Sequence, residues 1–210
     1  MTHISTGLTV LVVDDHPLFR QGFAAAWRRE RAGDHVLEAR NLSDAMAVLA
    51  QHHVDLAVVD LILPDGNGLE LCRYAADHGG VRAVMLSTYD AAAVVHAARR
   101  CGAAGFFPKD TDVHVLLTDV IRILQDEVAA RFPDVPTLPP LTRRELRVLG
   151  ELLDGASNPE IADRLSVSVE TVKTHVTSVM DKLGVNDRYA AASAARAWGF
   201  DIALPYLGDA

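Results

Sequence analysis

Short apolar runs alternate with longer amphipathic segments over the first 130 residues of the chain. Because the runs lack a strict polar–apolar alternation, they predict strands that are buried on both faces of a parallel sheet. The runs are Leu8–Val13, His35–Ala39, Leu56–Asp60, Ala83–Ser87 and Gly105–Phe107. Helical patterns lie near residues 17–30, 43–53, 68–78, 90–101 and 111–129. The five strand–helix units predict a doubly wound α/β domain with its site at the carboxyl ends of the strands.

After residue 140 the pattern is purely helical. Four short helices are expected, which would form a small bundle, and the connection Leu165–Ser168 has the length of a helix-turn-helix corner. The expected N-terminal caps of these helices are Thr142 with Glu145, Ser157 with Glu160, Ser168, and Asn186. In the first half, Ser43 is the expected cap of the second helix, and Thr111 or Asp110 that of the fifth.

The two patterns are separated by a proline-rich segment, Ala130–Pro140. Its prolines fix the backbone φ angle and remove amide donors, so the segment is expected to be a semi-extended spacer. We therefore expect an α/β domain over residues 1–129, a linker over 130–140 and an all-α domain over 141–210.

The composition argues against a membrane protein and against a small disulfide-rich protein. Half of the 210 residues are apolar, and no apolar stretch approaches the roughly 20 residues that span a bilayer, so we expect no membrane contact and a cytoplasmic protein. Two cysteines, Cys72 and Cys101, are too few for a disulfide framework, and we expect them to be small buried side chains. Residues 1–130 carry 17 acidic and 11 basic side chains, whereas residues 140–199 carry 8 of each. Any nucleic-acid binding must therefore depend on local placement of charge in the second half.

Acidic side chains gather at two of the predicted strand ends. Asp14 and Asp15 follow the first strand and Asp60 ends the third, and these ends are neighbours in a doubly wound sheet. Three adjacent carboxylates repel one another unless a cation lies between them, and their hard oxygens suit Mg²⁺. Ser87 and Lys109 end the two remaining strands at the same edge. Together these groups could bind a phosphoryl group and stabilise its transfer.

Several separately spaced motifs resemble a known family. The first half resembles the receiver domain of two-component response regulators in the segments VVDDHPLFRQG, VDLILPDGNGLEL, MLSTYD and AAGFFPKD. The second half resembles the LuxR-type helix-turn-helix in the segment LTRRELRVLGELLDGASNPEIADRLSVSVETVKTHVTSVMDKLGV. This order of domains is that of the NarL/FixJ family, and the resemblance covers about residues 8–128 and 139–199.

The resemblance implies that Asp60 is the phosphoacceptor, which takes a phosphoryl group from a phosphohistidine of a sensor histidine kinase. It implies direct binding of Mg²⁺ by Asp15, by Asp60 and by the backbone carbonyl of Ile62, with Asp14 acting largely through water. Catalysis would be limited to this transfer and to slow self-hydrolysis, so the protein is not expected to be an enzyme in the usual sense.

By the same resemblance, Lys109 pairs with a phosphoryl oxygen, and Ser87 donates its hydroxyl to the phosphoryl group. Movement of Ser87 would be coupled to the aromatic ring of Phe106, which lacks the hydroxyl of the tyrosine that relatives often have there. Pro108 is a further departure, because it removes one amide donor and is expected to disturb the edge pairing of the last strand.

The helix near Val169–Leu183 is the expected recognition helix, whose exposed N-terminal half would enter the major groove of DNA. Its apolar face consists of Val172, Val176, Val179, Met180 and Leu183. By resemblance, Lys173, Thr174 and Thr177 face the bases, and His175 lies beside the DNA backbone; Lys182 completes the expected DNA contacts.

The sequence therefore favours a DNA-binding response regulator that is phosphorylated on Asp60, forms a homodimer when phosphorylated and controls transcription. The alanine-rich segment Asn186–Trp198 is the candidate dimer surface. A phosphatase similar to the haloacid dehalogenase group is disfavoured, because Asp60-Leu-Ile62 lacks the second aspartate. A nucleotide-binding enzyme is disfavoured because no glycine-rich phosphate loop follows a predicted strand. A regulator that acts without phosphorylation stays open.

Overall fold

The computed structural model describes residues 7–125 and 130–207. The chain divides into two compact units. One holds the chain up to Asp90 together with Ala98–Asp134, and the other holds Ala91–Ala97 and the chain from Val135 onward.

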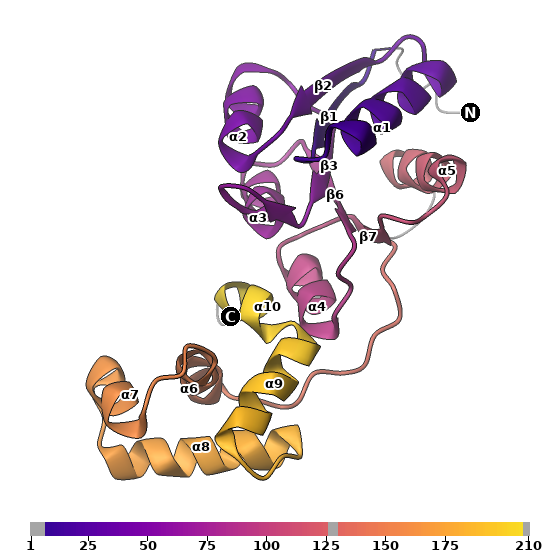
Figure 1. Cartoon of the computed structure of the whole chain (residues 1–210). Helices are drawn as coiled ribbons and strands as arrows, with labels where there is room; N and C mark the ends of the chain where they lie inside the picture. The colour runs from indigo at the N-terminus through magenta and orange to yellow at the C-terminus, as the bar shows by residue number, and fades with distance from the viewer. Residues whose placement is uncertain (1–6, 126–129, 208–210) are drawn as a thin grey trace. The chain divides into compact units, whose positions relative to one another are not determined.

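A five-stranded parallel sheet forms the centre of the first unit, in the order β2-β1-β3-β6-β7 (Figure 1). The doubly wound class that the sequence predicts is thereby confirmed. The strands are β1 (Thr9–Val13), β2 (His35–Ala39), β3 (Leu56–Asp60), β6 (Arg82–Ser87) and β7 (Gly105–Pro108). A small hairpin of β4 (Ile62–Leu63) and β5 (Gly66–Asn67), which the sequence pattern did not predict, follows β3.

Helices cover both faces of this sheet: α1 and α5 contact each other on one face, and α2 and α3 contact each other on the other (Figure 1). The helices of this half are α1 (Pro17–Glu30), α2 (Leu42–Gln51), α3 (Gly68–His78), α4 (Ala92–Arg100) and α5 (Val113–Leu124). Because successive strand residues point to opposite faces, Val10, Val12 and Val58 pack with Phe23 and Trp27 of α1 in one buried core. The expected helical pattern at 126–129 lies outside the described residues.

In the first half of the chain, the helix starts differ from the expected caps at two helices, α2 and α5. Asn41, rather than Ser43, caps α2, because its side chain accepts a hydrogen bond from the Asp44 amide at 2.7 Å. Ser43 instead donates its amide and hydroxyl to Asp65, which lies 22 residues away in the chain. Asp112 caps α5, in place of Thr111 or Asp110.

Pro108 does not disturb the pairing of β7, contrary to the expectation from sequence. It is the Cα partner of Ser87, and the next amide, that of Lys109, donates to the Ser87 carbonyl at 3.0 Å. Since neighbouring strand residues direct their amides to opposite sides, the missing donor of Pro108 faces the outer edge of the sheet. A proline at that position costs no ladder hydrogen bond.

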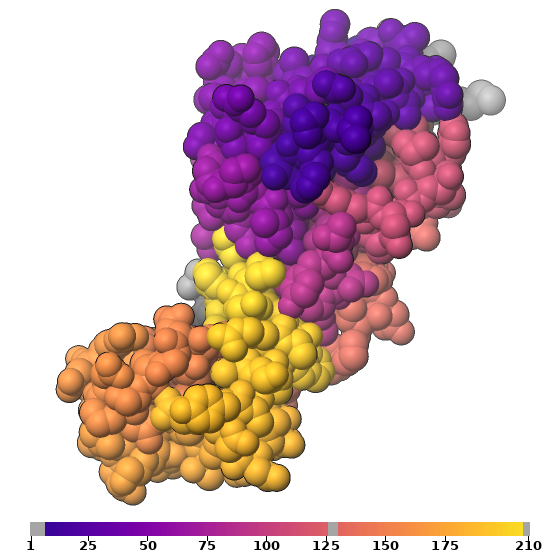
Figure 2. All heavy atoms as spheres, in the orientation of Figure 1, coloured from indigo at the N-terminus to yellow at the C-terminus, as the bar shows by residue number. Residues whose placement is uncertain are grey.

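The second half is a helical bundle, as predicted, but it contains one more helix than expected. Its helices are α6 (Arg143–Leu153), α7 (Asn158–Leu165), α8 (Val169–Leu183), α9 (Arg188–Trp198) and the unexpected α10 (Phe200–Leu207). In the space-filling view, the yellow atoms of α9 and α10 pack directly on the orange helices of this unit (Figure 2). The capping boxes Thr142–Glu145 and Ser157–Glu160 and the cap Ser168 are confirmed, whereas Asp187 rather than Asn186 caps α9.

A buried carboxylate joins α6, the first helix of the bundle, to α8, the expected recognition helix. Glu145 in α6 is 4% exposed and accepts hydrogen bonds from Ser178 at 2.6 Å and from Lys182 at 2.7 and 2.8 Å. Burial alone would raise the pKa of Glu145, but the hydrogen bonds from Lys182, Ser178 and Thr142 outweigh it and lower this pKa to about 2. The charged form of Glu145 is therefore stabilised in the folded bundle.

This shift predicts a pH-dependent stability. Because the pKa of Glu145 falls from 4.5 to about 2 on folding, its contribution is complete above about pH 4.5 and is lost as the pH falls toward 2. We expect Glu145→Gln to destabilise the bundle by about 2–3 kcal/mol at pH 7 and by less at pH 3. Urea unfolding followed by Trp198 fluorescence, with Trp27 replaced by Phe in every protein compared, measures this.

Glu170→Gln is the matched control, because the Glu170 side chain is 80% exposed where it pairs with Lys173. An exposed pair of this kind contributes well under about 1 kcal/mol. Equal losses from the two variants at pH 7 would contradict the stabilising role of Glu145.

Candidate phosphoacceptor and DNA-binding sites

Four adjacent strands of the sheet bring the predicted acidic site together. Asp14 follows β1, Asp60 ends β3, Ser87 ends β6 and Lys109 follows β7. Since these strands are neighbours and parallel, their carboxyl ends meet at one edge. The local backbone is tight there: α3 begins with Gly68, where any side chain would clash with the Asp60 carbonyl oxygen.

The ammonium group of Lys109 lies between two carboxylates. Its Nζ is 2.8 Å from Asp14 Oδ2 and 2.7 Å from Asp60 Oδ2. Both carboxylates are buried: Asp14 is 1% exposed and Asp60 is 6% exposed. The side chain of Phe19 packs on the same ammonium, with its ring centroid 5.4 Å from Nζ. Lys109 thus partly compensates two negative charges that would otherwise repel each other.

For both Asp60 and Lys109, burial and the neighbouring charges shift the pKa in opposite directions. Burial raises the pKa of the Asp60 carboxyl above its usual value, although the hydrogen bond and charge of Lys109 oppose this. Burial disfavours the charged form of Lys109, but its contacts with Asp14 and Asp60 outweigh the burial and raise its pKa. Lys109 is therefore held as an ammonium, ready to pair with a further anionic oxygen.

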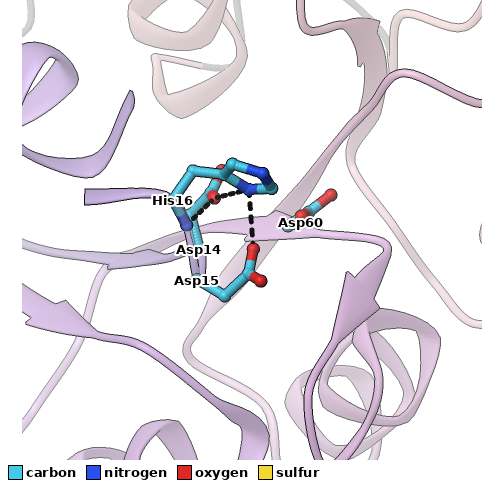
Figure 3. Close-up of side chains that lie close together, drawn as sticks. All are labelled: Asp14, Asp15, His16 and Asp60. Atoms are coloured by element: carbon cyan, nitrogen blue, oxygen red, sulfur yellow. Dashed lines mark hydrogen bonds and ion pairs between the residues drawn. The ribbon is translucent and has the colours of Figure 1, made fainter. Parts of the chain in front are cut away.

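Asp15 and His16 complete the rim of the site (Figure 3). His16 Nδ1 lies 2.7 Å from Asp15 Oδ1, and the His16 amide donates to Asp14 Oδ1 at 2.8 Å. Donor atoms of Asp14, Asp15, His16 and Asp60 all lie within 4.8 Å of one another. This spacing would let the three carboxylates share one cation. Sequence reasoning found the carboxylates but not His16, although its place directly after Asp15 puts it on the same strand end.

One oxygen in this cluster lacks a normal partner. Asp14 Oδ2 is the buried side-chain polar atom without a hydrogen-bond partner among the described residues. Its close contact is the ion pair with Lys109 Nζ at 2.8 Å, and Lys109 shares its single charge with Asp60. A buried oxygen of this kind is costly unless a further group satisfies it. The hard oxygen donors and this unsatisfied atom fit a divalent cation such as Mg²⁺.

A cavity of about 570 Å³ opens over Asp60 and is lined by Asp15, His16, Leu18, Phe19, Asp60, Ile62, Thr88 and Lys109. Ile62 lies in β4 and is 53% exposed there. Sequence reasoning missed Leu18, Phe19 and Thr88, because their role depends on the turn from strand to helix rather than on a chemical signal. A cavity of about 620 Å³ between α6 and α10 is larger, but it is lined by arginines and apolar groups and holds no nucleophile.

The two expected switch residues are both buried. Ser87 is 2% exposed, and its hydroxyl accepts a hydrogen bond from the Tyr89 amide at 2.9 Å. Phe106 is 1% exposed on β7, where it is the Cα partner of Met85. Phe107, the next residue, belongs to the core on the α1 and α5 side, so Phe106 faces the opposite side of the sheet. Cys72 and Cys101 are buried free thiols, as expected.

The outward face of α8 carries the predicted base-facing residues. Its shallow groove is lined by Glu170, Lys173, Thr174, Thr177, Ser178 and Asp181. Lys173 Nζ lies 3.1 Å from Glu170 Oε2, and the Thr174 hydroxyl donates to the Glu170 carbonyl at 3.1 Å. The face is exposed and close to neutral, so its character is hydrogen bonding more than bulk positive charge.

The two remaining residues expected at DNA, His175 and Lys182, are half-buried. Lys182 is held by the buried Glu145, a partner that sequence reasoning did not find, because 37 residues separate the two along the chain. Ser166 forms the corner before α8 in a left-handed backbone conformation, with φ of 53°. This corner sets the direction in which α8 leaves α7.

Among the described residues, no helix is both long and apolar enough to cross a membrane.

Comparisons with known proteins match both halves. Residues 10–121 match the response regulator receiver domain, and residues 139–195 match the luxR family of bacterial regulatory proteins. The probable transcriptional regulatory protein NarL of Mycobacterium tuberculosis is 33% identical over 203 residues, covering 89% of this chain and 92% of that protein. The nitrate/nitrite response regulator protein NarP of Escherichia coli is 32% identical over 202 residues, covering 89% and 94%.

Solved structures agree. The crystal structure of the response regulator ChrA has a TM-score of 0.51 at 29% identity and covers 93% of this chain and all of that one. A structure of RcsB dimers bound to DNA has a TM-score of 0.62 at 22% identity, covers 91% of this chain and 98% of that one, and is a likeness of fold.

The fold, the acidic strand-end site and the helix-turn-helix thus define a response regulator with a receiver domain and a luxR-type DNA-binding domain. The chain belongs to the NarL family of DNA-binding transcriptional response regulators.

Proposed function

We propose that this protein is phosphorylated on Asp60 by a sensor histidine kinase and that the phosphoryl group controls its dimerisation and binding to an operator. The observation that carries this proposal is the position of Lys109, whose ammonium lies 2.7 Å from Asp60 and 2.8 Å from Asp14 beneath an open cavity. A buried nucleophile, a held cation and room for a phosphoryl group are the parts that phosphoryl transfer needs.

In the transfer, one oxygen of the ionised Asp60 carboxylate attacks the phosphorus of a phosphohistidine. The P–O bond forms as the P–N bond breaks, and the electron pair of the broken bond stays on the imidazole nitrogen of the donor. Lys109 pairs with a phosphoryl oxygen, and Ser87 turns its hydroxyl from the Tyr89 amide toward the phosphoryl group. The protein's own chemistry is limited to accepting this group and losing it by slow hydrolysis.

Mg²⁺ is the proposed cofactor, and Asp15, Asp60 and the Ile62 carbonyl would hold it, with Asp14 acting largely through water. When bound, it neutralises charge on the phosphoryl oxygens and on the carboxylates. The crowding of donor atoms within 4.8 Å and the unsatisfied Asp14 Oδ2 support this assignment.

The second half would read DNA through α8. Lys173, Thr174 and Thr177 are proposed to face the bases, and His175 to lie beside the DNA backbone. Lys182, which is half-buried, is proposed as a further DNA contact. Because residues 140–199 carry equal numbers of acidic and basic side chains, few phosphates, about three or four per protomer, would be neutralised. Tight binding would then need two protomers, and phosphorylation would act largely by supplying the second.

We expect Asp60→Asn to abolish the mass gain of one phosphoryl group on incubation with Mg²⁺ and a small phosphodonor. The amide keeps the size of the side chain but removes the nucleophile. Intact-protein mass spectrometry measures this, and Asp77→Asn, an exposed position on α3, is the matched control that keeps full labelling. A stable adduct on the Asp60→Asn protein would contradict the assignment.

Millimolar Mg²⁺ at neutral pH should raise the melting temperature of the receiver half, because it relieves repulsion between the carboxylates. At 100 times its dissociation constant, a ligand that binds only the folded state adds about 2.7 kcal/mol. Asp15→Asn should remove most of this gain, whereas Asp44→Asn, on the exposed side of α2, should keep it. A melting temperature indifferent to Mg²⁺ in the unsubstituted protein would count against a shared cation site.

Lys173→Ala should weaken operator binding by about 1–3 kcal/mol and relax specificity at one base pair, if Lys173 binds a guanine edge. If Lys173 touches a phosphate instead, binding to all sequences should weaken equally, and the slope of log affinity against log salt should fall by about one. Titrations of operator and unrelated DNA at several salt concentrations separate these results. Arg40→Ala, an exposed receiver position, should leave both quantities unchanged.

A further inference from the structure

The start of the proline-rich segment lies on the outer edge of the receiver sheet. The sheet ends at β7, and the Phe106 amide of this strand donates to the Arg131 carbonyl at 2.7 Å. Gly105 and Arg131 also form a parallel bridge. We call residues 131–133 the edge strap. The strap extends the sheet by one residue beside Gly105, and its backbone hydrogen bond comes from Phe106, the expected switch residue.

Side chains hold the edge strap from both sides. The Arg131 guanidinium pairs with Asp119 of α5 and lies 5.8 Å from the centroid of the Phe107 ring. The Arg99 guanidinium lies 4.8 Å from the centroid of the Phe132 ring, and Arg99 Nη2 donates to the Pro133 carbonyl at 3.4 Å. The strap is therefore anchored by its backbone, by an ion pair and by two cation–π contacts.

Asp119 shows that the anchorage is specific. It is a carboxylate on the inner side of α5 and is only 7% exposed. A charge buried to this degree destabilises a fold unless it is paired, and Arg131 is the pairing partner. A spacer that merely separated two domains would need no such partner on the receiver.

The same edge is directly connected to the phosphoacceptor site. Ser87, the proposed hydroxyl donor to the phosphoryl group, is the Cα partner of Pro108, and its carbonyl accepts from the Lys109 amide. Phe106 lies two residues before Pro108 on β7, and its amide holds the strap. The segment that carries the strap's backbone hydrogen bond is therefore paired directly with the strand that carries Ser87.

We propose that the outer edge of β7 and Asp119 form a docking surface for the edge strap, and that phosphorylation of Asp60 releases the strap. This rests on the proposed function and deepens it by naming how the signal leaves the receiver. Release would add three residues to the free linker, which extends its reach by about 10 Å. The coupling is reciprocal: if phosphorylation loosens the strap, loosening the strap favours the phosphorylated state.

Hydrogen exchange of the Phe106 amide in the full chain tests the release. We expect the amide to be protected without a phosphodonor and to exchange about five- to tenfold faster once the protein is phosphorylated, the size expected for one lost backbone hydrogen bond. Amides of β2, at the opposite end of the sheet order from β7, should not change. If mass spectrometry shows the protein to be phosphorylated while the Phe106 amide keeps its protection, the proposed release of the strap is wrong. Absence of any phosphoryl adduct would instead overturn the proposed function itself.

Substitutions of the anchoring side chains should weaken the attachment of the strap to the receiver in the unphosphorylated protein. Arg131→Gln and Asp119→Asn should each speed exchange of the Phe106 amide and tighten the equilibrium binding of beryllofluoride, a mimic of the phosphoryl group, severalfold. Arg99→Gln, which loosens the strap from the other side and leaves the buried Asp119 paired, should do the same if the other variants fold poorly. Arg40→Gln breaks an exposed pair with Asp44 and is the matched control. A loss of stability with no change in beryllofluoride affinity would assign Arg131 a structural role alone and overturn the proposal.

Discussion

The contact of one ammonium group with two carboxylates is the constraint on which the receiver half depends. Lys109 Nζ lies within 2.8 Å of both Asp14 and Asp60, and both acids are buried. Two adjacent buried carboxylates are tolerated only with a cation close by. The contact forms only when β1, β3 and the end of β7 are in register, so the order of the sheet and the chemistry of the site require each other.

Both halves contain buried carboxylates that pair with a lysine, but the two clusters differ in whether every oxygen is hydrogen-bonded. In the receiver, Lys109 and its carboxylates border a cavity and one oxygen lacks a hydrogen bond, so the cluster can accept a further group. In the bundle, Glu145 is fully satisfied by Ser178, Lys182 and the Thr142 amide. An unsatisfied buried cluster is suited to ligand binding, whereas a satisfied one fixes the orientation of α8 relative to α6.

Between these clusters, the proline-rich segment has two roles. Its first residues continue the receiver through Arg131 and Asp119, and the prolines that follow keep the chain extended. The strap also covers the amide of Phe106, while Pro108 offers no donor at the next outward position of the strand. The outer edge of β7 is thereby closed to pairing with other strands.

Sequence alone determined the strand runs, most helices and the strand-end acids, because these depend on local periodicity and on the geometry of parallel sheets. The motifs also predicted both domain classes and their order. Tertiary structure decided what depends on distant partners: Asp65 binding the start of α2, Lys182 held by Glu145, and Arg131 paired with Asp119. Each of these contacts joins residues at least 12 positions apart, so no local pattern marks them. The physical reason is that a charged side chain selects its partner by proximity in the folded chain, and that proximity exists only after the sheet and the bundle have formed.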